Sequence, residues 1–90
     1  MTTPGKSVLE VMIQRHPGVY EEERLVLEAG EVIMKAMDAQ DVLRAEMADR
    51  LGVSRASVSQ VLSGRNMTLR KLAQMLFALG LRATITVEKI

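Results

Sequence analysis

Apolar residues recur every three or four positions along most of the chain, which is the spacing of helices with one buried face. Polar or glycine-containing breaks separate these stretches, so the pattern predicts five helices. They lie between Ser7 and His16, from about Val19 to the break at 38–41, from Asp41 to Gly52, from Ser54 to Gly64, and from Thr68 to Gly80. The core positions expected on the last four helices are Leu25, Val26, Ala29, Val32, Ile33, Ala36 and Met37; Leu43, Met47, Ala48 and Leu51; Val58, Val61 and Leu62; and Leu69, Leu72, Ala73, Leu76 and Leu79.

Residues suited to helix ends stand at the predicted boundaries. Asp41, Ser54 and Thr68 are each expected to accept a hydrogen bond from an amide in the helical turn that follows. Gly52 ends the third helix at a position that calls for a left-handed backbone. Gly30 lies inside the second helix, where glycine costs about 1 kcal/mol relative to alanine, so we expect a close packing contact there.

The final segment, residues 81–90, changes from the helical period to strict alternation of apolar and polar residues. This alternation predicts one β-strand with one apolar face. Because a lone strand leaves its backbone groups unpaired, we expect it to pair with the same strand of a second copy across a twofold axis. A frayed tail is the alternative. The side chains expected in this dimer strand are Ala83, Ile85 and Val87.

The composition describes one small domain without cysteine chemistry. The chain has 90 residues, an apolar fraction of 48% and no cysteine, which fits a modest aliphatic core and a cytoplasmic setting. No membrane span and no signal peptide are expected. His16 is the single histidine, and no catalytic, cofactor or metal motif is present, so an enzyme is the class expected least.

Charge is segregated along the chain although the net charge is only +1. Residues 1–43 carry eight acidic and four basic residues, whereas residues 44–71 carry six basic and two acidic residues. The basic block indicates a surface for phosphates or for an acidic partner, and a solvated helical surface is the plain alternative.

Two short predicted helices meet at a turn of about three residues that contains Gly52. Ala48 is small where these helices would cross, and Val58 and Val61 would anchor the second against the first. This stretch, with its flank 63–80, resembles the helix-turn-helix of the lambda-repressor and Cro-like family, also called the xenobiotic-response-element family of regulators. The resemblance implies an all-α, five-helix lambda-repressor-like domain, here followed by one C-terminal β-strand paired across a dimer.

The resemblance covers about residues 19–80. It divides the chain into an N-terminal arm with a short helix at 1–18, a DNA-binding domain at 19–80 and a dimerisation strand at 81–90. In such proteins the second helix of the motif enters the major groove of DNA and presents its first residues to base edges. The resemblance therefore implies that the base-reading residues are Arg55, Ala56 and Gln60, with Ser57 and Ser59 close by. The alternatives are that Arg55 contacts a phosphate and that Ser57 only supports the start of the helix.

Phosphate contacts are expected from helix starts and from the loop after the second helix of the motif. Arg44 stands where many relatives carry glutamine, so a phosphate contact there would have a different geometry. Arg70 and Lys71 are expected on the outer side of the last helix, where one could face DNA and either could be an ordinary solvated charge. The phosphate set is Arg44, Ser54, Arg65, Asn66, Thr68 and Arg70.

The function implied by the resemblance is sequence-specific binding of double-stranded DNA, most simply as a repressor that binds a palindromic operator as a homodimer. A first alternative is the antitoxin of a type II toxin–antitoxin pair that also controls its own operon, with the acidic segment 1–43 binding a basic toxin partner. A second alternative is a protein-interaction adaptor that keeps the fold without binding DNA.

Overall fold

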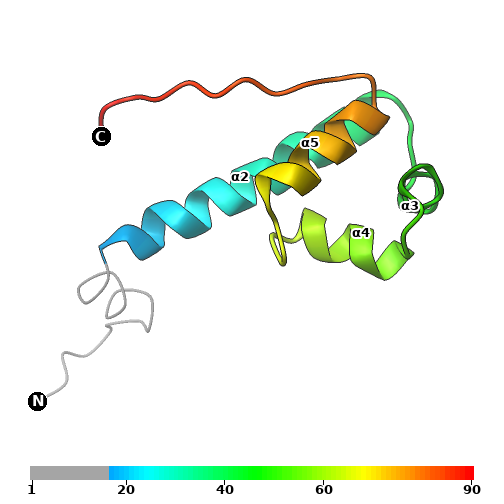
Figure 1. Ribbon diagram of the computed structural model, residues 1–90, viewed down its shortest axis with the longest axis horizontal. Coiled ribbons are helices and arrows are strands. Elements are labelled where there is room, and N and C mark those ends of the chain that lie inside the picture. The colour runs from blue at the N-terminus through cyan, green and yellow to red at the C-terminus, as the bar shows by residue number, and fades with distance from the viewer. Residues whose placement is uncertain (1–16) are drawn as a thin grey trace, which may run out of the picture.

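A computed structural model describes residues 17–90 of the chain as four helices and an extended C-terminal tail (Figure 1). The helices are α2 at Gly18–Ala39, α3 at Arg44–Leu51, α4 at Arg55–Leu62 and α5 at Leu69–Ala78. Within these residues there is no strand, so the predicted fold of five helices with a C-terminal strand is wrong, whereas the all-α helix-turn-helix arrangement fits. The helix expected between Ser7 and His16 lies outside the described residues.

The expected strand at residues 81–90 is an extended tail whose residues are all exposed. The tail turns back at the end of α5 and continues as an extended segment, with no second strand beside it within residues 17–90 (Figure 1). Alternation specifies which side of an extended segment is apolar, but a strand exists only where a second backbone supplies hydrogen bonds. The single chain offers no such edge within residues 17–90.

Most of the predicted helix ends are confirmed. The Ser54 hydroxyl accepts from the amide of Ser57, and the Thr68 hydroxyl accepts from the amide of Lys71, both at 3.1 Å. Gly52 has the left-handed φ of 68° that ends α3. The expected cap at Asp41 is wrong.

Asp41 lies in the turn before α3 instead of at its start. Its φ of 54° is left-handed, a conformation that aspartate tolerates better than most residues. The N-cap of α3 is Leu43, whose apolar side chain cannot accept a hydrogen bond from the helix. This turn buries Val42, at 6% exposure, and leaves Leu43 at 73%, so the core position expected at Leu43 is also wrong.

All four helices contribute to one aliphatic core. Ile33 of α2, Met47 of α3 and Val58 of α4 are its largest fully buried side chains. The other buried apolar residues are Met37, Val42, Ala48, Val61, Leu62, Met75, Leu76 and Leu79. Four further expected core positions, Leu25, Val32, Leu69 and Ala73, are exposed.

These four errors arise because α2 and α5 have apolar residues around more than one face. The buried face of α2 is centred on Gly30, Ile33 and Met37, and its N-terminal half projects past the other helices (Figure 1). The buried face of α5 is centred on Met75 and Leu76. Helical spacing alone does not tell which of two apolar stripes faces the core.

Gly30 is the point where α2 comes closest to α4. A Cβ atom added at Gly30 would overlap the carbonyl oxygen of Leu62 and lie 3.1 Å from its carbonyl carbon. The predicted close contact at Gly30 is therefore confirmed. It places the end of α4 directly against the backbone of the longest helix.

Two side chains hold the C-terminal end of α5. Arg50 Nη1 donates to the carbonyl oxygen of Ala78 at 2.8 Å, while its Nη2 pairs with Glu46 at 2.8 Å. Gln40 Nε2 donates to the carbonyl oxygen of Leu79, also at 2.8 Å. Carbonyl groups left without partners at a helix end are thus satisfied by side chains of α3 and of the turn after α2.

Candidate nucleic-acid interface

The α4 helix presents one buried side and one polar side. Val58, Val61 and Leu62 are buried against the other helices, as predicted. On the opposite side Arg55, Ala56 and Gln60 are exposed, and Ser57 and Ser59 are half-buried along the flanks. The five predicted base-reading residues therefore lie on one side of α4 or along its flanks, and three of them are exposed.

The start of α4 is held by a pair of serine hydroxyls. Besides the bond from the Ser57 amide, the oxygen atoms of Ser54 and Ser57 lie 2.9 Å apart. Both hydroxyls belong to the cap that begins the helix, so they fix the direction in which Arg55 and Ala56 leave the turn. Ser54, predicted to contact phosphate, lies at the same end of α4.

Arg44 reaches from the first turn of α3 to the middle of α4. Its Nη1 donates to Ser59 Oγ at 2.9 Å. One residue predicted for phosphate and one predicted for bases are thus in direct contact. The sequence pattern does not reveal this bond, since the two residues are 15 positions apart on different helices.

The loop between α4 and α5 carries the next phosphate candidates. The amide of Arg65 donates to the carbonyl oxygen of Gln60 at 2.8 Å, and Asn66 has a left-handed φ of 55°. This tight turn leaves both side chains exposed beside the end of α4. The Thr68 hydroxyl is engaged as the cap of α5, and Arg70 is exposed on its first turn.

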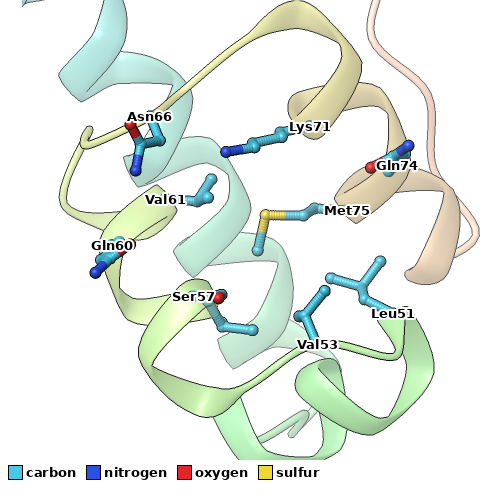
Figure 2. A pocket seen from close by; sticks show the side chains of 10 residues that line it. Leu51, Val53, Ser57, Gln60, Val61, Asn66, Lys71, Gln74 and Met75 are labelled. Atoms are coloured by element: carbon cyan, nitrogen blue, oxygen red, sulfur yellow. The ribbon is translucent and has the colours of Figure 1, made fainter.

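An open groove of about 360 Å³ lies between α4 and α5. Val61 and Met75 point into it, and Ser57, Gln60 and Asn66 surround it (Figure 2). The structure therefore brings two predicted base-reading residues and one predicted phosphate residue to the edge of one depression. Their amide and hydroxyl groups can donate or accept hydrogen bonds there.

Lys71, for which the sequence left a DNA contact and a solvated charge both open, is a half-buried groove residue. Its side chain extends from α5 toward the groove, whereas Arg70 is not among the lining residues (Figure 2). Gln74, one turn further along α5, also lines the groove. The cap at Thr68 could have indicated that Lys71 stands three residues into the helix, but not which face of α5 turns toward α4.

The predicted dimer residues Ala83, Ile85 and Val87 lie on the exposed tail. Ala83 and Ile85 line a second groove, of about 530 Å³, together with residues of α5. The predicted base-reading and phosphate residues are not among its lining residues, which are mostly apolar.

Within the described residues 17–90, no group of three or more histidine, cysteine, aspartate or glutamate side chains is arranged to hold a metal ion. In the same part of the chain, no helix combines the length and the apolar character needed to cross a membrane.

A family model described as a helix-turn-helix domain matches residues 17–88, which include all four helices and most of the tail. Neither the curated proteins nor the solved structures gave a match. A helix-turn-helix domain supports a role as a DNA-binding regulator.

Proposed function

Because this chain belongs to the helix-turn-helix domain family, we propose that it binds double-stranded DNA at a specific sequence and represses transcription by occupying that site. One observation carries the proposal. The polar side of α4 is uncovered while its apolar side is anchored in the core, so the helix can enter a groove without losing its packing.

The chemistry of this polar side suits the major groove. Arg55 can donate two hydrogen bonds to guanine, Gln60 can form a bidentate pair with adenine, and Ala56 can contact only a thymine methyl group. Ser57 and Ser59 on the flanks have single hydroxyls. Small side chains between the two long ones allow the backbone of α4 to come close to the base edges.

Phosphate contacts are proposed on both sides of α4. Arg44 lies at the start of α3, and Arg65 and Asn66 follow the end of α4, so the two sets flank the base-reading surface. Ser54, Thr68 and Arg70 extend these sets. Each phosphate neutralised by a cation releases counterions, so we propose that affinity falls steeply with salt.

A homodimer on a palindromic operator is part of the proposal. Two copies would place their α4 helices about 34 Å apart, one turn of the duplex. The surface proposed for the second copy is the apolar face of α5, where Leu69 is 69% and Phe77 is 83% exposed. Large exposed apolar side chains gain stability when a partner covers them. Ala83 and Ile85 of the tail line the same groove as this face, and Val87 is exposed further along the tail.

The direct test is selection of bound sites from random DNA, followed by titration of the selected duplex at several salt concentrations. Gln60→Ala is expected to relax base choice at one position, costing about 1–3 kcal/mol there. Arg65→Ala should weaken all sequences about equally and reduce the salt slope by about one. Absence of salt-sensitive binding to any selected or genomic fragment would contradict the proposal and favour the adaptor alternative.

A second candidate function is an antitoxin, and the acidic α2 helix favours it. Gly18–Ala39 carries six acidic and two basic residues. One of the basic residues, Arg24, is bonded to Glu21 at 2.9 Å and to Glu28 at 3.1 Å, and the bond to Glu21 raises its pKa. On the same helix Leu25, at 59%, is an exposed apolar side chain.

An acidic surface with apolar side chains suits a basic protein partner. The test is co-expression with the product of the adjacent gene, using Glu22→Lys with Glu23→Lys as the disrupting variant and Arg70→Glu as the control. A complex that forms equally well with the disrupting variant would contradict this use of α2.

A further inference from the structure

The bond between Arg44 and Ser59 restricts what the Ser59 hydroxyl can do. A serine hydroxyl has one proton and two lone pairs, whereas a guanidinium can only donate. Since Arg44 Nη1 donates to Ser59 Oγ at 2.9 Å, Ser59 is the acceptor in this pair. The proton of Ser59 must therefore point elsewhere.

Within residues 17–90 the structure offers that proton no acceptor. The neighbouring Ser63 differs, because its hydroxyl donates to the carbonyl oxygen of Gln60 at 2.9 Å. The Ser59 hydroxyl has no hydrogen bond in this part of the chain besides the one from Arg44, although the Ser59 backbone carbonyl accepts from the Ser63 amide. Its proton is left for a group that approaches α4 from outside.

We infer that Arg44 is a positioning residue that occupies one of the two lone pairs of Ser59 and leaves the Ser59 proton for DNA, so that a base edge with an acceptor opposite Ser59 is favoured. This inference rests on the proposed function. In the major groove guanine O6 and N7, adenine N7 and thymine O4 are acceptors, whereas cytosine presents only its amino donor. Opposite cytosine the Ser59 proton would find no acceptor, so Ser59 disfavours cytosine on the strand it faces.

The same guanidinium keeps other donors free. Arginine has five N–H groups, and the bond to Ser59 uses one of them. The other N–H groups can donate to phosphate oxygens, the contact proposed for Arg44 above. Arg44 thereby links a backbone contact to the orientation of a base-contacting hydroxyl.

The test compares site selection from random DNA by the wild-type chain, Arg44→Met and Arg44→Lys. The wild-type chain should exclude cytosine at one position of each half-site. Arg44→Met removes the donor that holds the Ser59 hydroxyl in one orientation, so discrimination at that position should fall about tenfold, the change expected for one lost base contact. Arg44→Lys, whose ammonium also only donates, should keep the preference.

Arg70→Met is the matched control, because Arg70 is also a proposed phosphate contact but makes no side-chain bond within residues 17–90. It should lower affinity for all sites without changing the base preference. In a Ser59→Ala background, Arg44→Met should no longer alter the preference at that position. Thermal unfolding by circular dichroism verifies that each variant is folded before selection.

Two outcomes separate the inference from the proposed function. If the wild-type chain selects a site and Arg44→Met keeps the same base preference, the inference is wrong and the proposed function stands. If the wild-type chain selects no sequence at all, the proposed function itself fails, and the inference falls with it.

Discussion

Replacing Gly30 by alanine tests the close approach of α2 and α4. Alanine is favoured over glycine inside a helix by about 1 kcal/mol, so helix propensity alone predicts a more stable protein. The structure predicts the opposite, because the new Cβ would overlap the Leu62 carbonyl oxygen. This neighbour is backbone, not the end of a flexible side chain, and cannot turn aside.

The expected change in stability combines the gain in helix propensity with the cost of the overlap at Leu62. Overpacking costs about 1–3 kcal/mol, and an unyielding backbone neighbour places Gly30→Ala near the upper value. Subtracting the gain in helix propensity leaves a net loss of about 2 kcal/mol in the free energy of unfolding. For a domain of this size that corresponds to a fall in Tm of about 10 °C.

The assay is urea denaturation followed by far-ultraviolet circular dichroism, with Gly18→Ala as the matched control. A Cβ at Gly18, in the same helix, would meet nothing within 4 Å, so this variant should be at least as stable as the wild-type chain. If Gly30→Ala proves as stable as Gly18→Ala, the contact between α2 and α4 is not as close as described.

Three further substitutions test the N-cap of α4, the hydrogen bond from Arg50 to the end of α5, and the proposed dimer surface. Ser54→Ala removes the hydroxyl that accepts from the Ser57 amide and should cost about 1 kcal/mol in urea denaturation; an unchanged midpoint would refute the cap. Arg50→Met removes the bond to the Ala78 carbonyl oxygen and should also lower the free energy of unfolding by about 1 kcal/mol, whereas Arg70→Met should cause no measurable loss. Equal urea midpoints for the two variants would show that the Arg50 bond does not stabilise the fold. Phe77→Ser should weaken self-association in analytical ultracentrifugation with little change in Tm, because the side chain is 83% exposed; an unaltered association constant would exclude the α5 face as the dimer surface.

Local chemistry was the most predictable part of this chain. The hydroxyls of Ser54 and Thr68 cap helices, and Gly52 adopts the left-handed backbone that ends α3. Each role depends only on the residue itself and its place at a helix end, so it could be predicted from the sequence. The cap predicted at Asp41 was wrong because the same carboxylate residue also tolerates a left-handed turn. The buried side of α4 was predictable because it has a single apolar stripe.

Features that depend on two distant parts of the chain could not be predicted. The orientations of α2 and α5 depend on which of their apolar stripes fits the neighbouring helices. For this reason Leu25 and Leu69 were predicted in the core but are exposed. The expected strand needs a partner backbone that the single chain lacks. The bond from Arg44 to Ser59 and the position of Lys71 in the groove arise only once three helices are packed.

The α4 helix is constrained at both ends before any ligand arrives. The serine pair holds its first turn, and the backbone of Gly30 stops its last residue, Leu62, from shifting toward α2. The conformational entropy of ordering this helix is therefore lost when the chain folds, not when it meets a partner. Association should accordingly resemble the docking of a rigid body, with a heat-capacity change accounted for by the contact area alone.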